Sequence, residues 1–310
     1  VFKQPNLLAY DGMIEFGKSA ENIERIFSVK NIPSDSAMRE MLDEIDVSVL
    51  NPLFPRLFDY ARSHGALEDL RCLGGGFLLA LDGTGFYSSK KVHCDRCLEK
   101  HHKDGSITYH HQMVAGVLIK PEQRSVFPIG FEEIKKQDGT EKNDCERNAS
   151  SRFLARIRND HPKTKFTVVE DALSSNAPHI EQLLAMNFSF IIVAKPGDHK
   201  FLFNEFNAAL ASDSADIYEW VDSKQVTHSY IFKNNLPLNE SNQAVRVNFL
   251  SYWTTDKNGK ELYSNTWVSN IELSHESVIR VATAGRARWK IENETFNTLK
   301  NNGYNLEHNF

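Results

Sequence analysis

Cysteine is scarce in this sequence, long apolar runs are missing, and basic residues are not in excess. Four cysteines in 310 residues do not make a disulfide scaffold, and two of them form a C-x2-C, which favours a reducing cytosol. The best apolar segment, Phe188–Ala194, is far shorter than the roughly 20 residues of a transmembrane helix, so we expect no membrane partner. The formal net charge of −5 argues mildly against nucleic-acid binding, although local patches of charge decide that question.

Low-complexity runs, internal repeats and a signal peptide are also missing. The chain begins at Val1 and not at methionine, and we therefore expect a trimmed or mature fragment. With 41% hydrophobic and 25% charged residues, the composition is that of a soluble globular protein. A length of 310 residues is enough for one large domain or two ordinary ones with an ample core.

Residues 1–75 are predicted to form a helical N-terminal region. Ser19 can cap one helix, Ser34 to Ser36 can cap a second with an apolar face, and Gly65 is expected just after the end of a third. Two short helices joined across residues 30–33 fit a helix-turn-helix that reads DNA. They also fit plain helical packing, which we favour.

Residues 76–198 alternate between apolar strands and amphipathic helices. The continuous run Phe77–Leu81 predicts a strand buried on both faces. From 199 to 272 the pattern is purely β, with a hairpin signal at Asn258-Gly259, and from 273 to 310 it is helical. We therefore expect an α/β (α+β) fold, in which a mixed-sheet core flanked by helices carries a mainly β insertion.

The stretch 285–303 is predicted to be one helix of roughly four turns that ends at its final glycine. On a helical wheel, Glu292 falls on the apolar side together with Arg288. Lys290 and Glu294 fall on the opposite, solvent side. A carboxylate that faces the core is costly unless it is paired or bound to a metal. The stretch therefore predicts either a buried Glu–Arg ion pair that only braces the helix, or a metal ligand.

Two further acids, Asp82 and Asp171, each follow an apolar strand pattern. Ligand sites gather beyond the carboxyl ends of strands, so these two acids and Glu292 are expected to meet there. Three converging carboxylates repel one another unless a cation neutralises them, and oxygen-only ligands suit Mg²⁺ or Mn²⁺. A pair of such ions about 3.5–4 Å apart is the usual clamp for displacement at phosphorus. Each Asp alone is also explained as a strand-end turn residue that bonds local backbone.

Four segments of the sequence resemble the DDE transposases of bacterial insertion sequences, namely LLALDGTG, DCERNA, VVEDALSSNAP and GRARWKIENETFNTLK. The resemblance covers about residues 75–310 and points to the cut-and-paste group with a β insertion between the second and third acids. It implies an RNase H-like core and a catalytic triad of Asp82, Asp171 and Glu292 that holds two Mg²⁺ or Mn²⁺ ions. It also implies cleavage at terminal inverted repeats, which leaves a 3′-hydroxyl that attacks target DNA.

The family signature around the last acid is Tyr-x2-Arg-x3-Glu-x6-Lys. Arg288-x3-Glu292 fits this signature, whereas the Tyr position is Gly285. The Lys position is Leu299, and Lys300 stands one place later. The resemblance therefore implies DNA contacts by Arg288, and a long flexible side chain also allows Lys300 to reach a phosphate.

Some members of this family stack a flipped base on a tryptophan of the β insertion, and the resemblance points to Trp267 for this role. The alternative is that Trp267 is a half-buried aromatic residue of a sheet. The family also implies double-stranded DNA as the partner, a DNA-dependent homodimer that brings two ends together, and a bacterial cytoplasmic protein associated with the nucleoid.

A second group of candidate ligands lies between the first two core strands. C-x2-C followed closely by histidines is ligand spacing for tetrahedral zinc, and the expected ligands are Cys94, Cys97, His102 and His111. Within each histidine pair, His101 and His110 are the alternatives, and Cys145 is a further candidate. The rival interpretation is a loop of solvated histidines that partly contact phosphate, with five basic residues, Lys90, Lys91, Arg96, Lys100 and Lys103. A structural zinc here would brace a loop beside the active centre without taking part in catalysis.

Three functions remain in competition. The first is a DNA transposase, a metal-dependent phosphoryl-transfer enzyme. The second is an RNase H-like nuclease that cuts without strand transfer. The third is a zinc-braced DNA-binding protein whose acids are vestigial.

Overall fold

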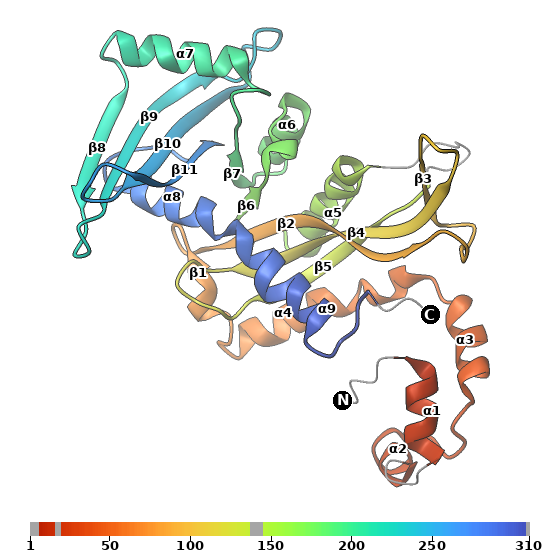
Figure 1. The fold of residues 1–310 in the computed structure, drawn as a ribbon. Coiled ribbons are helices and arrows are strands. Elements are labelled where there is room, and N and C mark those ends of the chain that lie inside the picture. The colour runs from red at the N-terminus through yellow and green to blue at the C-terminus, as the bar shows by residue number, and fades with distance from the viewer. Residues whose placement is uncertain (1–5, 16–19, 137–144, 308–310) are drawn as a thin grey trace.

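The computed structural model describes residues 6–15, 20–136 and 145–307 of the chain. In this part of the chain the strands that form one large sheet are β1 Arg71–Cys72, β2 Gly76–Ser89, β3 Leu98–His101, β4 Ile107–Ile119, β5 Phe127–Ile134, β6 Phe166–Glu170, β7 Ser189–Val193, β8 Asp216–Val221, β9 Thr227–Pro237, β10 Arg246–Thr255 and β11 Glu261–Ser269. The α-helices are α1 Leu7–Glu15, α2 Ala20–Phe27, α3 Asp35–Asp43, α4 Leu53–Ser63, α5 Glu146–Asp160, α6 Ala177–Ala185, α7 Lys200–Ala211, α8 Ser277–Arg286 and α9 Asn297–Asn301. A large mixed sheet flanked by helices (Figure 1) confirms the predicted α/β class.

The sheet combines parallel and antiparallel pairs. Its strands follow the order β3-β4-β2-β6-β7-β11-β10-β9-β8, while β5 pairs with β4 and β1 pairs with β2. β2 is parallel to β6, and β6 is parallel to β7. The other pairs are antiparallel. Every residue of β6 is buried, as expected for a short apolar strand whose two faces are both covered.

The two faces of the sheet carry separate cores. On one face, α4, α5 and α6 contribute Phe58, Phe153 and Ile180 to the first core. On the other face, α8 and the segment after it contribute Val281 and Ile291 to the second core. In Figure 1, α8 and α9 run across the sheet on the side opposite α5 and α6. The C-terminal segment is therefore fixed over the middle of the sheet, next to β2.

β2 is longer than the sequence predicts. The prediction that Asp82 ends its strand is wrong, because β2 continues to Ser89 by pairing with β4, with Asp82 opposite Ala115. The pairing of β2 with its parallel neighbour β6 ends just before Asp82, because the last register pair between these strands joins Ala80 to Val169. Asp82 thus lies just past the carboxyl end of the parallel pairing, which is where the strand-end argument requires an acid.

The insertion at 199–272 contains the expected strands and hairpin. The turn between β10 and β11 includes Asn258 and Gly259, and Gly259 has a φ of +78°, which favours glycine. The expectation of a purely β pattern is wrong at the start of the insertion, where α7 packs Phe206 on Phe249 at a centroid distance of 4.3 Å. Because β11 pairs with β7, the insertion strands extend the core sheet.

The late helix predicted over 285–303 is interrupted. α8 ends at Arg286, a 3-10 turn spans Ala287–Trp289, and Ile291–Phe296 form a π-helix before α9. π-helices are rare, occur mostly as single turns inside helical segments, and are frequent at functional sites. A change of helix type alters the angle between successive side chains. A wheel drawn at 100° per residue therefore does not predict which side chains of this segment face the core.

The described part of the N-terminal region is mainly helical, as predicted. The Ser34 side chain accepts a hydrogen bond from the Ala37 N–H at 3.3 Å at the start of α3, and Gly65 follows α4 with a φ of +74°. α3 has no buried residue, and α4 buries Phe58 in the first core. The predicted capping residue Ser19 lies outside the described residues. Among the helices that are described, none is long and apolar enough to cross a membrane.

Gly116 in β4 provides a test of the packing between the sheet and α5. A Cβ added at Gly116 would lie 2.3 Å from Cζ of the fully buried Phe153, so the aromatic ring would have to move. We expect Gly116→Ala to lower the free energy of unfolding by about 1–3 kcal/mol, measured by urea denaturation. Gly197→Ala is the control, because a Cβ there meets nothing within 4 Å. Equal stabilities of the two variants would contradict this packing.

Candidate functional site

Arg288 joins two of the predicted acids. Its Nη1 donates to Oδ2 of Asp82 at 3.1 Å, and its Nη2 donates to Oε1 of Glu292 at 2.9 Å. Asp82 comes from the middle of β2, whereas Arg288 and Glu292 come from the interrupted helical segment. The structure thus brings the first and third acids of the expected triad to the same guanidinium group.

The orientation predicted by the wheel is wrong for this segment. Lys290 was expected on the solvent side, but it is buried, and its Nζ donates to the carbonyl of Gln123 at 2.7 Å. The Glu292 side chain is 51% exposed, whereas that of Glu294 is 20% exposed. The 3-10 turn and the π-helix account for the difference, because they rotate the side chains away from their α-helical positions.

Asp82 is an acid in an unfavourable place for a charge. Burial, together with the charges of Glu292 and Glu146, raises the pKa of Asp82 to about 6 against the opposing effect of Arg288. The Gly83 N–H donates to Oδ1 of Asp82 at 3.0 Å, which favours the charged form. The Asp82 carboxylate therefore lies where additional positive charge would be strongly favourable.

Glu146 is a fourth acid of this site that the sequence analysis did not select. It is the first residue of α5, and a Cβ added to Gly83 would lie 2.6 Å from its Oε2. Burial and the nearby Asp171 both raise the pKa of Glu146. Only a glycine at position 83 leaves room for this carboxylate beside Asp82. Glu146 lies within the segment DCERNA, but an acid in the first turn of a helix is usually explained by the helix dipole.

Asp171 follows β6 and faces the same region. Its side chain accepts a hydrogen bond from the Leu173 N–H at 3.0 Å and so caps a 3-10 turn, as the turn interpretation predicts. The preceding Glu170 points elsewhere, because it is buried and bonded to His179 at 2.6 Å. Burial lowers the pKa of His179, but the charge and hydrogen bond of Glu170 outweigh burial and raise this pKa. The hydrogen bond between the two side chains holds β6 against α6.

Asp82 and Glu292 contact Arg288, Glu146 and Asp171 lie in the same region, and the four carboxylates do not form a closed cage. Among the described residues, no three carboxylates have ligand oxygens that all lie within 4.8 Å of one another. Glu146 packs against Gly83, the residue after Asp82 in β2, and its negative charge contributes to the raised pKa of Asp82. In the present arrangement, the positive charge beside Asp82 is the guanidinium group of Arg288.

A cavity of about 400 Å³ opens beside Asp171 and Arg288. Three cationic side chains, Lys195, Arg286 and Arg288, line it together with Asp171. Trp289 also lines this cavity, and it is 45% exposed. Lys195 follows β7 in the way that Asp171 follows β6, so the strand-end rule that selected Asp171 would also have found Lys195.

Two predicted DNA contacts lie elsewhere. Trp267 is fully buried in the second core, and its indole packs against Gly285, where an added Cβ would lie 2.7 Å from Nε1. The prediction that Trp267 stacks a base is therefore wrong, since no base can reach a fully buried ring. Lys300 forms an ion pair with Glu307.

Cys94, Cys97 and His111 form a cluster that could hold a metal ion. The two Sγ atoms are 3.8 Å apart, and Nε2 of His111 lies 3.4 Å from Sγ of Cys94 and 3.3 Å from Sγ of Cys97. Both cysteines precede β3, and His111 projects from β4. The choice of His111 is confirmed as a member of this cluster.

His102 is not part of that cluster, so its selection as a ligand is not supported by the structure. Its Nε2 is within 2.8 Å of Oγ1 of Thr108. His102 follows β3 at the far end of the hairpin, whereas the two cysteines precede β3. Among the described residues, the only group of three or more His, Cys, Asp or Glu side chains with ligand spacing is Cys94, Cys97 and His111.

The sequence matches no protein-family model, and no curated protein is significantly similar to it. The function is therefore inferred from the geometry of the site together with the motifs of the sequence.

Asp82 should make the stability of the protein depend on pH. Its pKa of about 6 in the folded protein exceeds the ordinary value of 3.8, so its contribution to stability is full below about pH 4 and is lost as the pH rises through about 6. Asp82→Asn removes this titration. We expect the variant to gain about 1–3 kcal/mol relative to the wild type between about pH 4 and pH 7. Urea denaturation across this range measures the difference, with the exposed Asp216→Asn as control. A difference that does not change with pH would contradict the assignment.

Proposed function

We propose that this protein is a metal-dependent DNA transposase that cleaves transposon ends and joins the resulting 3′-hydroxyl to target DNA. The observation that supports this most directly is the gathering of Asp82, Glu146, Asp171 and Glu292 around Arg288, beside a cavity lined by cations. Phosphoryl transfer requires such a combination, because acids hold divalent cations and basic side chains hold the phosphate. The mixed α/β sheet is compatible with the RNase H-like core that the resemblance implies.

The acids are suited to hold Mg²⁺ or Mn²⁺. Asp82 and Glu146 both have raised pKa values because they are buried and lie close to other acids, so a nearby divalent cation would be favoured. When bound, one or two such ions would activate the attacking oxygen and stabilise the leaving oxygen. Binding of an ion against Asp82 would compete with the Arg288 guanidinium for the same carboxylate.

The chain's own residues would position the DNA. Arg286 and Lys195 line the cavity and can donate to phosphate oxygens. Arg288 also lines this cavity, and its guanidinium group can donate to a phosphate there once it is released from Asp82. Double-stranded DNA is then the proposed partner, two chains act together on two ends, and the bacterial cytoplasm is the proposed location.

Two other functions have specific support. The bridge from Arg288 to Asp82 and Glu292 neutralises two acids without a metal, which favours a DNA-binding protein whose acids are only structural. A nuclease that cuts without strand transfer has the same acids. Metal-dependent DNA cleavage would exclude the DNA-binding protein without activity. Joining of the cut ends to target DNA would distinguish the transposase from the nuclease.

Cleavage assays on labelled duplexes that carry the DNA flanking the coding sequence test the proposal. With Mg²⁺ or Mn²⁺, we expect the wild type to cut and to join ends to a target plasmid. We expect Asp82→Asn and Glu292→Gln to lower the cleavage rate by roughly two orders of magnitude or more, because each removes a charge that the reaction needs. Asp216→Asn, an exposed substitution on β8, is the matched control. Undiminished cleavage by both active-site variants would refute the assignment of the acids.

We further propose that Cys94, Cys97 and His111 bind a structural zinc ion. A tetrahedral zinc with sulfur ligands at about 2.3 Å and nitrogen at about 2.0–2.1 Å requires an S–S separation of about 3.8 Å and S–N separations of about 3.5 Å. The S–S distance of 3.8 Å and the S–N distances of 3.4 and 3.3 Å are close to these values. The ion would tie the start of β3 to β4.

Metal analysis of the purified protein tests the zinc proposal. We expect about one zinc per chain in the wild type, and less than about a tenth of that in Cys97→Ser, because two remaining ligands hold zinc weakly. His102→Ala should keep its zinc, since His102 lies outside the cluster, and this variant is the matched control. Absence of zinc from wild-type protein prepared without chelators, or equal loss in both variants, would count against the site.

A further inference from the structure

One projecting part of the sheet, which we call the blade, carries a net positive charge in this acidic chain. The blade consists of residues 86–112 and includes β3 with the outer ends of β2 and β4. It carries five of the twelve histidines, and it has five basic and three acidic residues. It is thus two units positive, while the rest of the chain is seven units negative. All five basic side chains, Lys90, Lys91, Arg96, Lys100 and Lys103, are exposed.

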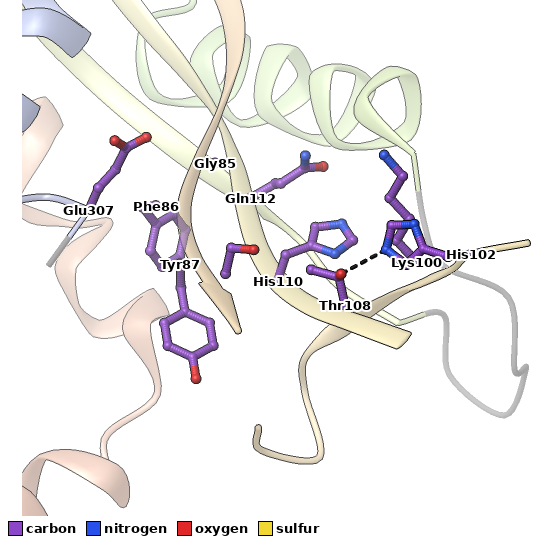
Figure 2. Close-up of a pocket in the computed structure, with 10 residues that line it drawn as sticks. Gly85, Phe86, Tyr87, Lys100, His102, Thr108, His110, Gln112 and Glu307 are labelled. Carbon is purple, nitrogen blue, oxygen red and sulfur yellow. Dashed lines mark hydrogen bonds between the residues drawn. The ribbon is translucent and has the colours of Figure 1, made fainter. Parts of the chain in front are cut away.

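One face of the blade forms a groove of about 510 Å³. Figure 2 shows side chains from all three strands of the blade directed toward it. The residues of the groove that matter here are Phe86, Lys100, His102, Thr108, His110 and Gln112. Glu99 pairs with Lys136 and Glu307 pairs with Lys300, and no acid in the described part of the chain forms an ion pair with Lys100.

The groove and the metal cluster occupy opposite sides of the blade. His110 and His111 are neighbours on β4, and successive side chains of a strand point to opposite faces. His110 lines the groove, whereas His111 lies in the cluster. Leu98, the first residue of β3, is paired with His110 of β4. The two cysteines just before Leu98 lie against His111, the next residue of β4. The groove is therefore built on a strand pair that the cluster ties together.

The lining is suited to a phosphate backbone. Lys100 supplies a positive charge, while hydroxyl, amide and imidazole groups supply hydrogen-bond donors that do not depend on base identity. The ring of Phe86 adds an apolar surface for a sugar or an unpaired base. Among the described residues, Glu307 is the one acid that lines the groove, and it is paired with Lys300.

The groove and the acid site share one strand. β2 carries Asp82 in the acid site and Ser88 in the groove, and six residues of strand span about 20 Å. The same length covers about six phosphates of one DNA strand, which is roughly half a helical turn. We propose that the groove binds the DNA backbone about half a turn away from the phosphodiester held at the acids. The assignment of DNA as ligand rests on the proposed function.

Fluorescence anisotropy with a labelled duplex of about 30 base pairs tests the groove. All proteins carry Asp82→Asn, so that binding is measured without cleavage. We expect Lys100→Ala with His110→Ala to raise Kd roughly 3–10-fold at about 0.1 M salt and to lower the salt slope by about one, because phosphate contacts are lost. Lys100→Arg should bind nearly as the parent does. Lys257→Ala, an exposed substitution in the β10–β11 turn, is the matched control, and thermal melting verifies that each variant is folded.

Three outcomes would overturn this inference. The first is a double variant that binds as tightly as Lys257→Ala, with an unchanged salt slope. The second is competition by polyglutamate that equals competition by DNA at matched charge, which would make the groove a site for acidic proteins. The third is wild-type protein that neither binds nor cuts any duplex, in which case the proposed function falls as well. If wild-type cleavage persists while the groove variants bind normally, only the inference about the groove fails.

Discussion

The contact between the Arg288 guanidinium and Asp82 is the interaction on which the site depends. It connects the centre of the sheet to a helical segment 206 positions later in the chain. A buried carboxylate on a central strand is unfavourable by itself, and burial accordingly raises its pKa to about 6. The cation lowers this penalty, and it also determines how the last helical segment lies across β2. Glu292 bonds the same guanidinium group, which also acts electrostatically on Glu146, so Arg288 joins β2 to the last helical segment.

The sequence predicts the frame of this molecule well because its signals are local or strongly periodic. The apolar run Phe77–Leu81 requires burial on both faces, and it lies in the middle of the sheet. Asn258-Gly259 and Ser34 act through adjacent backbone groups, and both features occur where the pattern indicates. The end of β2 was mispredicted because Asp82 is held by a partner strand that no local signal reveals.

The site was harder to predict, for reasons that are also physical. Glu292 and Lys290 exchanged their expected environments because a π-helix changes the angular step, and no rule of periodicity anticipates that change. Glu146 becomes an active-site candidate only through the missing side chain of Gly83, which is a tertiary contact. Trp267 shows the converse, since an aromatic residue suited to stacking is covered completely by α8. Spacing selected His111 correctly but did not separate it from His102, because ligand geometry depends on how the hairpin folds.

The alternation of His110 and His111 along β4 also determines what a misaligned pairing of this strand would do. A shift of one residue in the pairing of β4 would turn His110 toward the cysteines and His111 toward the groove, so both faces would fail together. A metal bound by Cys94, Cys97 and His111 would stabilise only the native alignment, because the neighbouring alignment presents a differently positioned imidazole. The cluster would then act as a lock on strand register, and the shape of the polar face would be secured by chemistry on its reverse side.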